Sequence, residues 1–150
     1  MTVDREHELY TRFGEAALYA QMFEYGFAYL LSFRDGMADA INGKFVGLDA
    51  SIAKWRSATA GRMAKSLRKE YGAILDNVMD LWDRAVSERN RLMHRFFIEH
   101  APDTLSEVGM QRALEDADQL RDLFIEADRA CVDVRDTTVR NMQDFARGAQ

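Results

Sequence analysis

The 150-residue chain has few of the residues that build disulfide frameworks or interrupt helices. Cys131 is its only cysteine, so no intramolecular disulfide can form, and we expect a reducing compartment. A lone cysteine among apolar neighbours is more typical of a small buried side chain than of a nucleophile. Pro102 is the only proline, which leaves long segments free to form uninterrupted helices.

The sequence also lacks the patterns of the commonest metal and phosphate sites. His7, His94 and His100 are not spaced as metal ligands, and no pair of cysteines accompanies them. No glycine-rich phosphate loop is present, nor a Gly-x-Ser-x-Gly nucleophile elbow. We therefore expect neither a metal nor a cofactor.

Long apolar runs are missing as well. The longest apolar stretches, around Ala16–Phe23 and Phe27–Phe33, are too short and too interrupted to span a bilayer. The first residues carry charges of both signs, unlike a secretory signal peptide. The sequence predicts a cytoplasmic protein without a membrane partner.

The formal net charge of −5 argues against general coating of nucleic acid, but it leaves room for a local basic site. Such a site is suggested by residues 54–69, a segment with six basic residues and no acidic one. The six are Lys54, Arg56, Arg62, Lys65, Arg68 and Lys69. Two interpretations stay open: a solvated face that pairs with the acidic C-terminal half, or a track for the phosphate backbone of RNA.

Apolar residues recur at helical spacing along most of the chain. We predict an all-α fold, an antiparallel bundle of four main helices plus short helical pieces, in a single domain over residues 1–150. The predicted main helices are Asp4–Phe33, Asp49–Tyr71 with a possible break at Gly61, Ala73–Glu99, and a last helix that begins after a Thr104 or Ser106 cap and runs to Phe145. We expect a turn at Arg34–Gly36 and a short helix at Met37–Asn42.

The first predicted helix carries more apolar and aromatic surface than one helical face needs. A helix that is apolar over so much of its circumference is central to a core or lies at a subunit interface. Stacking of nucleic-acid bases on its aromatic rings is a third possibility.

Arg89 stands inside an apolar stripe of the third predicted helix, between Ala85 and Leu92. A guanidinium there is costly unless something pairs with it. One interpretation is a structural ion pair with a carboxylate of a neighbouring helix. The other is a functional site with His94, which lies about 7.5 Å along the helix axis and about 140° around it from Arg89.

Histidine and arginine together can cleave RNA without a metal. His94 would exchange a proton with a 2′-hydroxyl or with the leaving group. The planar fork of Arg89 would hold the scissile phosphate and stabilise its added charge. Asn90 is four residues before His94 and shares its helical face, so it would orient His94 or the phosphate.

The pattern Arg89-Asn90-x-x-x-His94 resembles the signature of the HEPN superfamily, an arginine and a polar residue followed by a histidine four to six residues after the arginine. The resemblance implies a metal-independent endoribonuclease that leaves a 2′,3′-cyclic phosphate. It also implies a homodimer that brings two motifs into one cleft, and often a toxin or phage-defence role with a cognate antitoxin or regulatory protein.

The same family often adds an acidic or polar residue from an early helix to the site. Glu15, Gln21 and Glu24 are the candidates in this chain, and the sequence does not choose among them. The superfamily also includes inactive members. The alternative function is therefore a non-catalytic helical interaction module in which Arg89 is a structural ion-pair residue.

Overall fold

The structure is a computed structural model that describes residues 3–44 and 47–148. Within these ranges it contains α-helices and two short 3₁₀ helices and no strand, which confirms the all-α fold. The α-helices are α1 (Val3–Ile41), α2 (Leu48–Arg56), α3 (Ala60–Tyr71), α4 (Met79–His94), α5 (Phe96–His100) and α6 (Glu107–Gly148). The 3₁₀ helices are η1 (Gly72–Leu75) and η2 (Asp103–Leu105).

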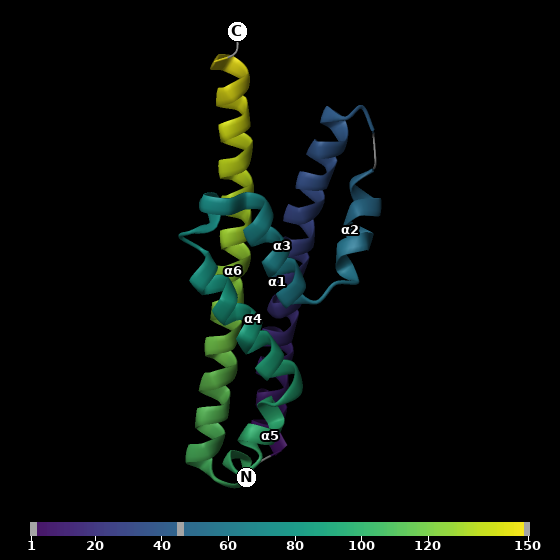
Figure 1. Ribbon diagram of the computed structural model, residues 1–150. Helices are drawn as coiled ribbons and strands as arrows, with labels where there is room; N and C mark the ends of the chain where they lie inside the picture. The colour runs from purple at the N-terminus through teal and green to yellow at the C-terminus, as the bar shows by residue number, and fades with distance from the viewer. Residues whose placement is uncertain (1–2, 45–46, 149–150) are drawn as a thin grey trace.

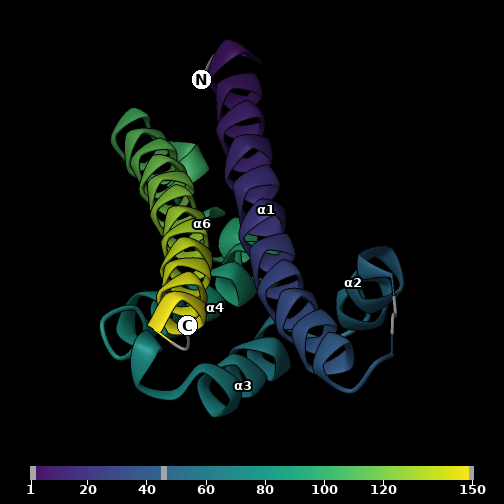
Figure 2. The same ribbon diagram turned by 90° about the horizontal axis from the view of Figure 1, so that it is seen from above.

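The two long helices, α1 and α6, lie side by side along most of the molecule (Figures 1 and 2). Arg12 pairs with Asp118, and further along both helices Gly26 lies against Cys131. Because the residue numbers rise together, α1 and α6 run in the same direction. This parallel pair is the frame to which the other helices attach.

Helix α4 packs against both long helices in the opposite direction. The ring of Phe27 on α1 meets Trp82 near the start of α4, whereas Phe13 meets Phe96 just beyond its end. The Trp82 indole also donates a hydrogen bond of 3.1 Å to the carbonyl of Ala127 on α6. The expected antiparallel bundle therefore describes α4 correctly, but it does not describe the relation of α1 to α6.

The predicted apolar stripes meet in one core. In the first helix most stripe residues are buried, and Phe13 and Ala17 are half-buried. Every residue assigned to the stripe of the last helix is buried: Leu114, Ala117, Leu120, Phe124, Ala127, Cys131 and Val134. Trp82, fully enclosed, links the two stripes from α4. Burial of side chains this large contributes about 1.5–3 kcal/mol each to folding.

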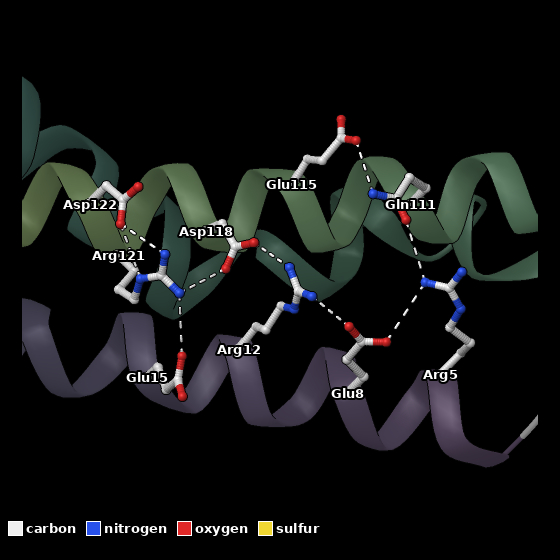
Figure 3. Close-up of polar contacts among 9 residues, drawn as sticks. All are labelled: Arg5, Glu8, Arg12, Glu15, Gln111, Glu115, Asp118, Arg121 and Asp122. Carbon is white, nitrogen blue, oxygen red and sulfur yellow. Dashed lines mark hydrogen bonds and ion pairs between the residues drawn. The ribbon is translucent and has the colours of Figure 1, made fainter.

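A ladder of charged side chains runs along the outside of the parallel pair (Figure 3). Arg12 bridges Glu8 on its own helix and Asp118 on α6. One turn further on, Arg121 of α6 pairs with Asp118 at 3.0 Å and reaches Glu15 of α1 at 3.5 Å. Shared partners reduce the side-chain entropy lost per ion pair, so the ladder helps to hold the register of α1 against α6.

The expected turn at Arg34–Gly36 is wrong, because α1 continues through it to Ile41. Contacts from other helices keep this segment helical. The Asp35 carboxylate accepts hydrogen bonds from Ser51, Lys54 and Trp55 of α2. The helix ends before Gly43, whose φ of +69° is a conformation that glycine adopts without strain.

Two further predicted helices are divided differently in the structure. The predicted helix Asp49–Tyr71 forms α2 and α3 with a break at residues 57–59 rather than at Gly61, and the Thr59 side chain caps α3. The predicted helix Ala73–Glu99 begins only at Met79 and is interrupted at Arg95. As a result the Arg-Asn-His motif occupies the last two turns of α4.

Candidate functional site

Arg89 lies at the contact between α4 and α1, where it forms a two-point ion pair. Its Nε is 2.6 Å from Oε1 of Glu24, and its Nη2 donates to Oε2 of the same carboxylate at 3.3 Å. The side chains keep 27% and 20% of their surface exposed, so the pair sits at the edge of the core rather than inside it. This contact explains how a guanidinium is tolerated within an apolar stripe.

The structure distinguishes among the three early-helix candidates. Glu24 meets Arg89, whereas Glu15 belongs to the ionic ladder with Arg121 and Gln21 is exposed. Asn90 joins the Glu24–Arg89 pair, because its Oδ1 accepts a hydrogen bond of 3.2 Å from Nη1 of Arg89. Glu24, Arg89 and Asn90 thus form one polar cluster, which we call the Arg89 cluster.

His94 is the last residue of α4, and it is exposed. Within the described ranges no hydrogen bond or ion pair joins His94 to Arg89, whose guanidinium is turned toward α1. This separation follows from their angular offset on a single helix. In one protomer the two side chains therefore do not share a contact, and the Arg89 guanidinium is held by Glu24 while His94 is exposed at the end of α4.

The six basic residues of segment 54–69 fall into two groups. Lys54 and Arg68 are engaged, Lys54 with Asp35 at 3.3 Å and Arg68 with Asp83 at 2.8 Å. The others are exposed: Arg56 at the end of α2, and Arg62, Lys65 and Lys69 on α3. The spacing of the last three places them on one face of α3.

The start of α3 lies close to the Arg89 cluster. A Cβ on Gly61 would be 3.9 Å from Val86, which is one turn before Arg89 on α4. A groove of about 350 Å³ between α1 and the α2–α3 junction is lined in part by Gln21, Glu24 and Arg56. The structure thus brings the first part of the basic segment and the Arg89 cluster to neighbouring surfaces.

A second cluster, which sequence reasoning missed, joins α4, α5 and α6. The Arg91 guanidinium forms a two-point ion pair with Asp116 at 2.8 and 2.9 Å. His100 lies between two carboxylates, 2.7 Å from Asp116 and 2.8 Å from Asp103. We call this the Asp116 cluster. No spacing in the sequence signals it, because its members come from separate elements.

The electrostatics of the Asp116 cluster favour the charged state of its acids. Burial opposes ionisation of Asp116, but hydrogen bonds from Arg91 and His100 outweigh it and lower the pKa of this carboxyl. The hydrogen bond from His100 lowers the pKa of Asp103 in the same way. Both ring nitrogens of His100 are occupied, so this histidine has no free nitrogen with which to accept a proton from a substrate. The cluster therefore serves to tie the three elements together.

A groove of about 480 Å³ beside the Asp116 cluster is also unsuited to RNA. Its lining includes Glu88, Asp116, Asp122 and Glu126, and these carboxylates would repel a phosphate backbone. Arg91, which also lines it, is already paired, so the exposed Arg84 is the one other basic residue of the described lining against these four carboxylates. Of the two sides of α4, the side with the Arg89 cluster is the better candidate for an anionic ligand.

Comparisons with models of protein families, with curated proteins and with solved structures find no match for this chain. No helix of residues 3–44 and 47–148 combines the length and apolar character that a membrane crossing requires. In the same ranges no three His, Cys, Asp or Glu side chains gather as metal ligands would. The HEPN resemblance thus rests on Arg89, Asn90 and His94.

Replacing Asp116 with Asn should destabilise the protein by about 1–3 kcal/mol at pH 7, because Arg91 and His100 lose their shared charged acceptor. The folded-state pKa of Asp116 is lowered, so its contribution is complete above the unfolded value of about 4 and is lost as the pH falls through the folded value. The difference from wild type in urea denaturation should therefore shrink at pH 3. Glu126→Gln, an exposed change in the same groove, should have little effect; an equal loss in both variants would contradict the assignment.

Proposed function

We propose that the protein is a metal-independent endoribonuclease whose catalytic residues are Arg89, Asn90 and His94. The observation that carries the proposal is the Arg89 cluster, a partly exposed guanidinium held by a carboxylate, on the same helix as the exposed His94. Arginine recognises phosphate through its planar fork, and histidine moves protons near neutral pH. These two groups suffice for cleavage by the 2′-hydroxyl.

In this reaction His94 takes the proton from the 2′-hydroxyl, whose oxygen then forms a bond to phosphorus. The bond from phosphorus to the 5′-oxygen breaks, which gives a 2′,3′-cyclic phosphate. The leaving oxygen takes a proton from water, and His94 returns its own proton to water. Arg89 stabilises the charge that develops on the phosphate. Among the described residues its Nη1 is bonded only to the neutral amide of Asn90, so this part of the guanidinium can best turn to a phosphate oxygen. Glu24 orients the guanidinium through Nε and Nη2.

A homodimer accounts for the separation of Arg89 from His94. The Arg89 guanidinium is turned toward α1 and, within the described ranges, is not bonded to His94 of its own chain. A second copy related by a two-fold axis could place its own His94 beside the phosphate that Arg89 binds. The exposed apolar residues of α1, such as Tyr10 and Leu18, provide surface for such a contact.

RNA would reach this site across the exposed basic residues of α2 and α3. Arg56, Arg62, Lys65 and Lys69 are free of the ion pairs that engage Lys54 and Arg68 in the described part of the chain. The start of α3 borders the part of α4 that carries the Arg89 cluster. A toxin or phage-defence role, with an antitoxin or regulatory protein as partner, fits such a nuclease.

The second candidate is a non-catalytic helical interaction module, and the two-point Glu24–Arg89 contact favours it. In that case Arg89 serves only to join α4 to α1, and His94 has no role in chemistry. The two candidate functions differ in whether Arg89 itself is needed. Exchanging Glu24 and Arg89 tests this, because the exchange keeps an ion pair between α1 and α4 but removes the arginine from α4.

The purified protein should cleave single-stranded RNA in EDTA, and His94→Ala should slow cleavage about 100-fold or more, the usual contribution of a general acid–base group. Cleavage is measured by the appearance of 2′,3′-cyclic phosphate ends. His7→Ala, which changes another exposed histidine, is the matched control. Equal rates for wild type and His94→Ala would remove His94 from the mechanism.

The double variant Glu24→Arg/Arg89→Glu serves as the control for Arg89. Nuclease function predicts that thermal stability is largely kept while cleavage is lost, because the phosphate now meets a carboxylate. If the protein is an interaction module, neither the wild type nor any variant should cleave RNA. Arg89→Ala should then lower the thermal stability, and the double variant should restore it.

Replacing Arg62, Lys65 and Lys69 with Gln should weaken RNA binding and flatten its dependence on salt. The variant neutralises fewer phosphates, so fewer counterions are released when RNA binds. Fluorescence anisotropy of a labelled oligoribonucleotide at several salt concentrations measures the slope. Arg129→Gln/Arg147→Gln, two exposed changes on α6, provides the control. An unchanged slope in the triple variant would assign the basic face to solubility.

Subunits carrying Arg89→Ala and subunits carrying His94→Ala should regain part of the activity when they are unfolded and refolded together. A mixed dimer with a composite site keeps one intact Arg–His pair, whereas each parent dimer keeps none. Activity is compared with that of each variant refolded alone. No recovery in a mixture shown to contain mixed dimers would place each pair within one protomer, and a protein that cuts RNA as a monomer would rule out the dimer.

A further inference from the structure

A third groove opens between α1 and α6, and its character differs from that of the other two. It has a volume of about 300 Å³ and is mainly apolar. Its lining includes Met22, Tyr25, Tyr29, Leu30, Val132 and Asp128. Tyr25 and Val132 keep 49% and 41% of their surface exposed, so the apolar wall is open to solvent.

Gly26 forms part of this groove and keeps it open. A Cβ at this position would lie 3.0 Å from the sulfur of Cys131 and 3.3 Å from Oδ1 of Asp128. A glycine here therefore lets α1 approach α6 closely and leaves the Asp128 carboxylate uncovered. The Cys131 thiol beneath it is buried, and its pKa is raised by that burial and by the charge of Asp128, so it stays neutral.

Asp128 is half-buried, and no side chain of residues 3–44 and 47–148 pairs with it. Burial alone raises the pKa of its carboxyl, with no cation to oppose the shift. Arg135, at the edge of the groove, does not pair with Asp128, because its guanidinium is held by Asp136 at 2.7 Å. Glu24 and Asp116, by contrast, each have an arginine partner. The groove thus presents one uncompensated negative charge on an apolar and aromatic surface.

We propose that this groove binds a small aralkyl amine, with the ammonium group against Asp128 and the apolar body between Tyr25, Met22 and Val132. An ammonium would supply the counter-charge that the carboxylate lacks, in a setting less screened than bulk water. The tyrosine rings favour a cation over their faces. The volume is at the lower end of ligand pockets, which suits one aromatic ring on a short chain.

This proposal does not depend on the nuclease proposal. Gly26 is two residues from Glu24, which places the two positions about 160° apart around α1. Met22 and Tyr25 line both this groove and the groove that contains Glu24, so the two surfaces adjoin along α1. The carboxylate of Asp128 would repel a phosphate, which directs RNA to the Arg89 side of α1.

The test is a titration of the full-length, isotope-labelled protein followed by amide chemical shifts in NMR at pH 7. Three probes of similar shape are compared: 2-phenylethylamine, neutral 2-phenylethanol and anionic 3-phenylpropionate. The amine should shift the amides around the groove with saturation and bind more tightly than the alcohol, and the acid should bind most weakly. Asp128→Asn should weaken amine binding about tenfold, a change equivalent to about 1.4 kcal/mol, and remove the preference over the alcohol.

Asp133→Asn, an exposed change on the same helix outside the groove, should leave the amine affinity unchanged. Tyr25→Ala should weaken amine binding more than alcohol binding, because it removes an aromatic face from the cation. Equal affinity of the wild type for amine and alcohol would overturn the proposal. So would an unchanged affinity in Asp128→Asn, or no shifts at the groove with millimolar amine.

Discussion

The packing of α1 against α6 is the constraint on which the rest of the structure depends. These helices are parallel, so the chain must return between them, and α4 makes this return antiparallel to both. Trp82 fills the space between the three helices and donates its indole N–H to the carbonyl of Ala127. The charged ladder from Arg12 to Arg121 holds the same pair in register at the surface.

Both candidate sites are consequences of that packing. Glu24 faces α4 from one side of α1, and Gly26 faces α6 from the other. On the α4 side a carboxylate has an arginine partner, and the resulting cluster suits an anionic ligand. On the α6 side the Asp128 carboxylate has none within residues 3–44 and 47–148, and the groove suits a cation. Two surfaces of opposite charge preference thus lie on two sides of α1, with Met22 and Tyr25 in the lining of both grooves.

The Arg89 contact can stabilise the fold and also provide the orientation that the proposed chemistry requires. A two-point ion pair with Glu24 compensates the burial of the guanidinium and also fixes its orientation. An arginine that must stabilise a developing charge benefits from the same fixed orientation. The Asp116 cluster contains a similar set of residue types, but both nitrogens of His100 are bonded there, and its groove is acidic. His100 is thus enclosed by its bonds to two carboxylates, whereas His94, on the same helix as the Arg89 cluster, is exposed.

The sequence by itself determined the all-α class, the buried stripe of α6 and the unusual position of Arg89, because each is a property of helical spacing along one segment. It did not determine the continuation of α1 past Asp35 or the pairing of Arg89 with Glu24 rather than with Glu15 or Gln21. Those outcomes depend on side chains of other helices, which only the tertiary structure brings into contact. The tertiary structure alone also decided that α1 and α6 are parallel and that Asp128 lies at their contact. Both outcomes depend on residues about a hundred positions apart in the sequence.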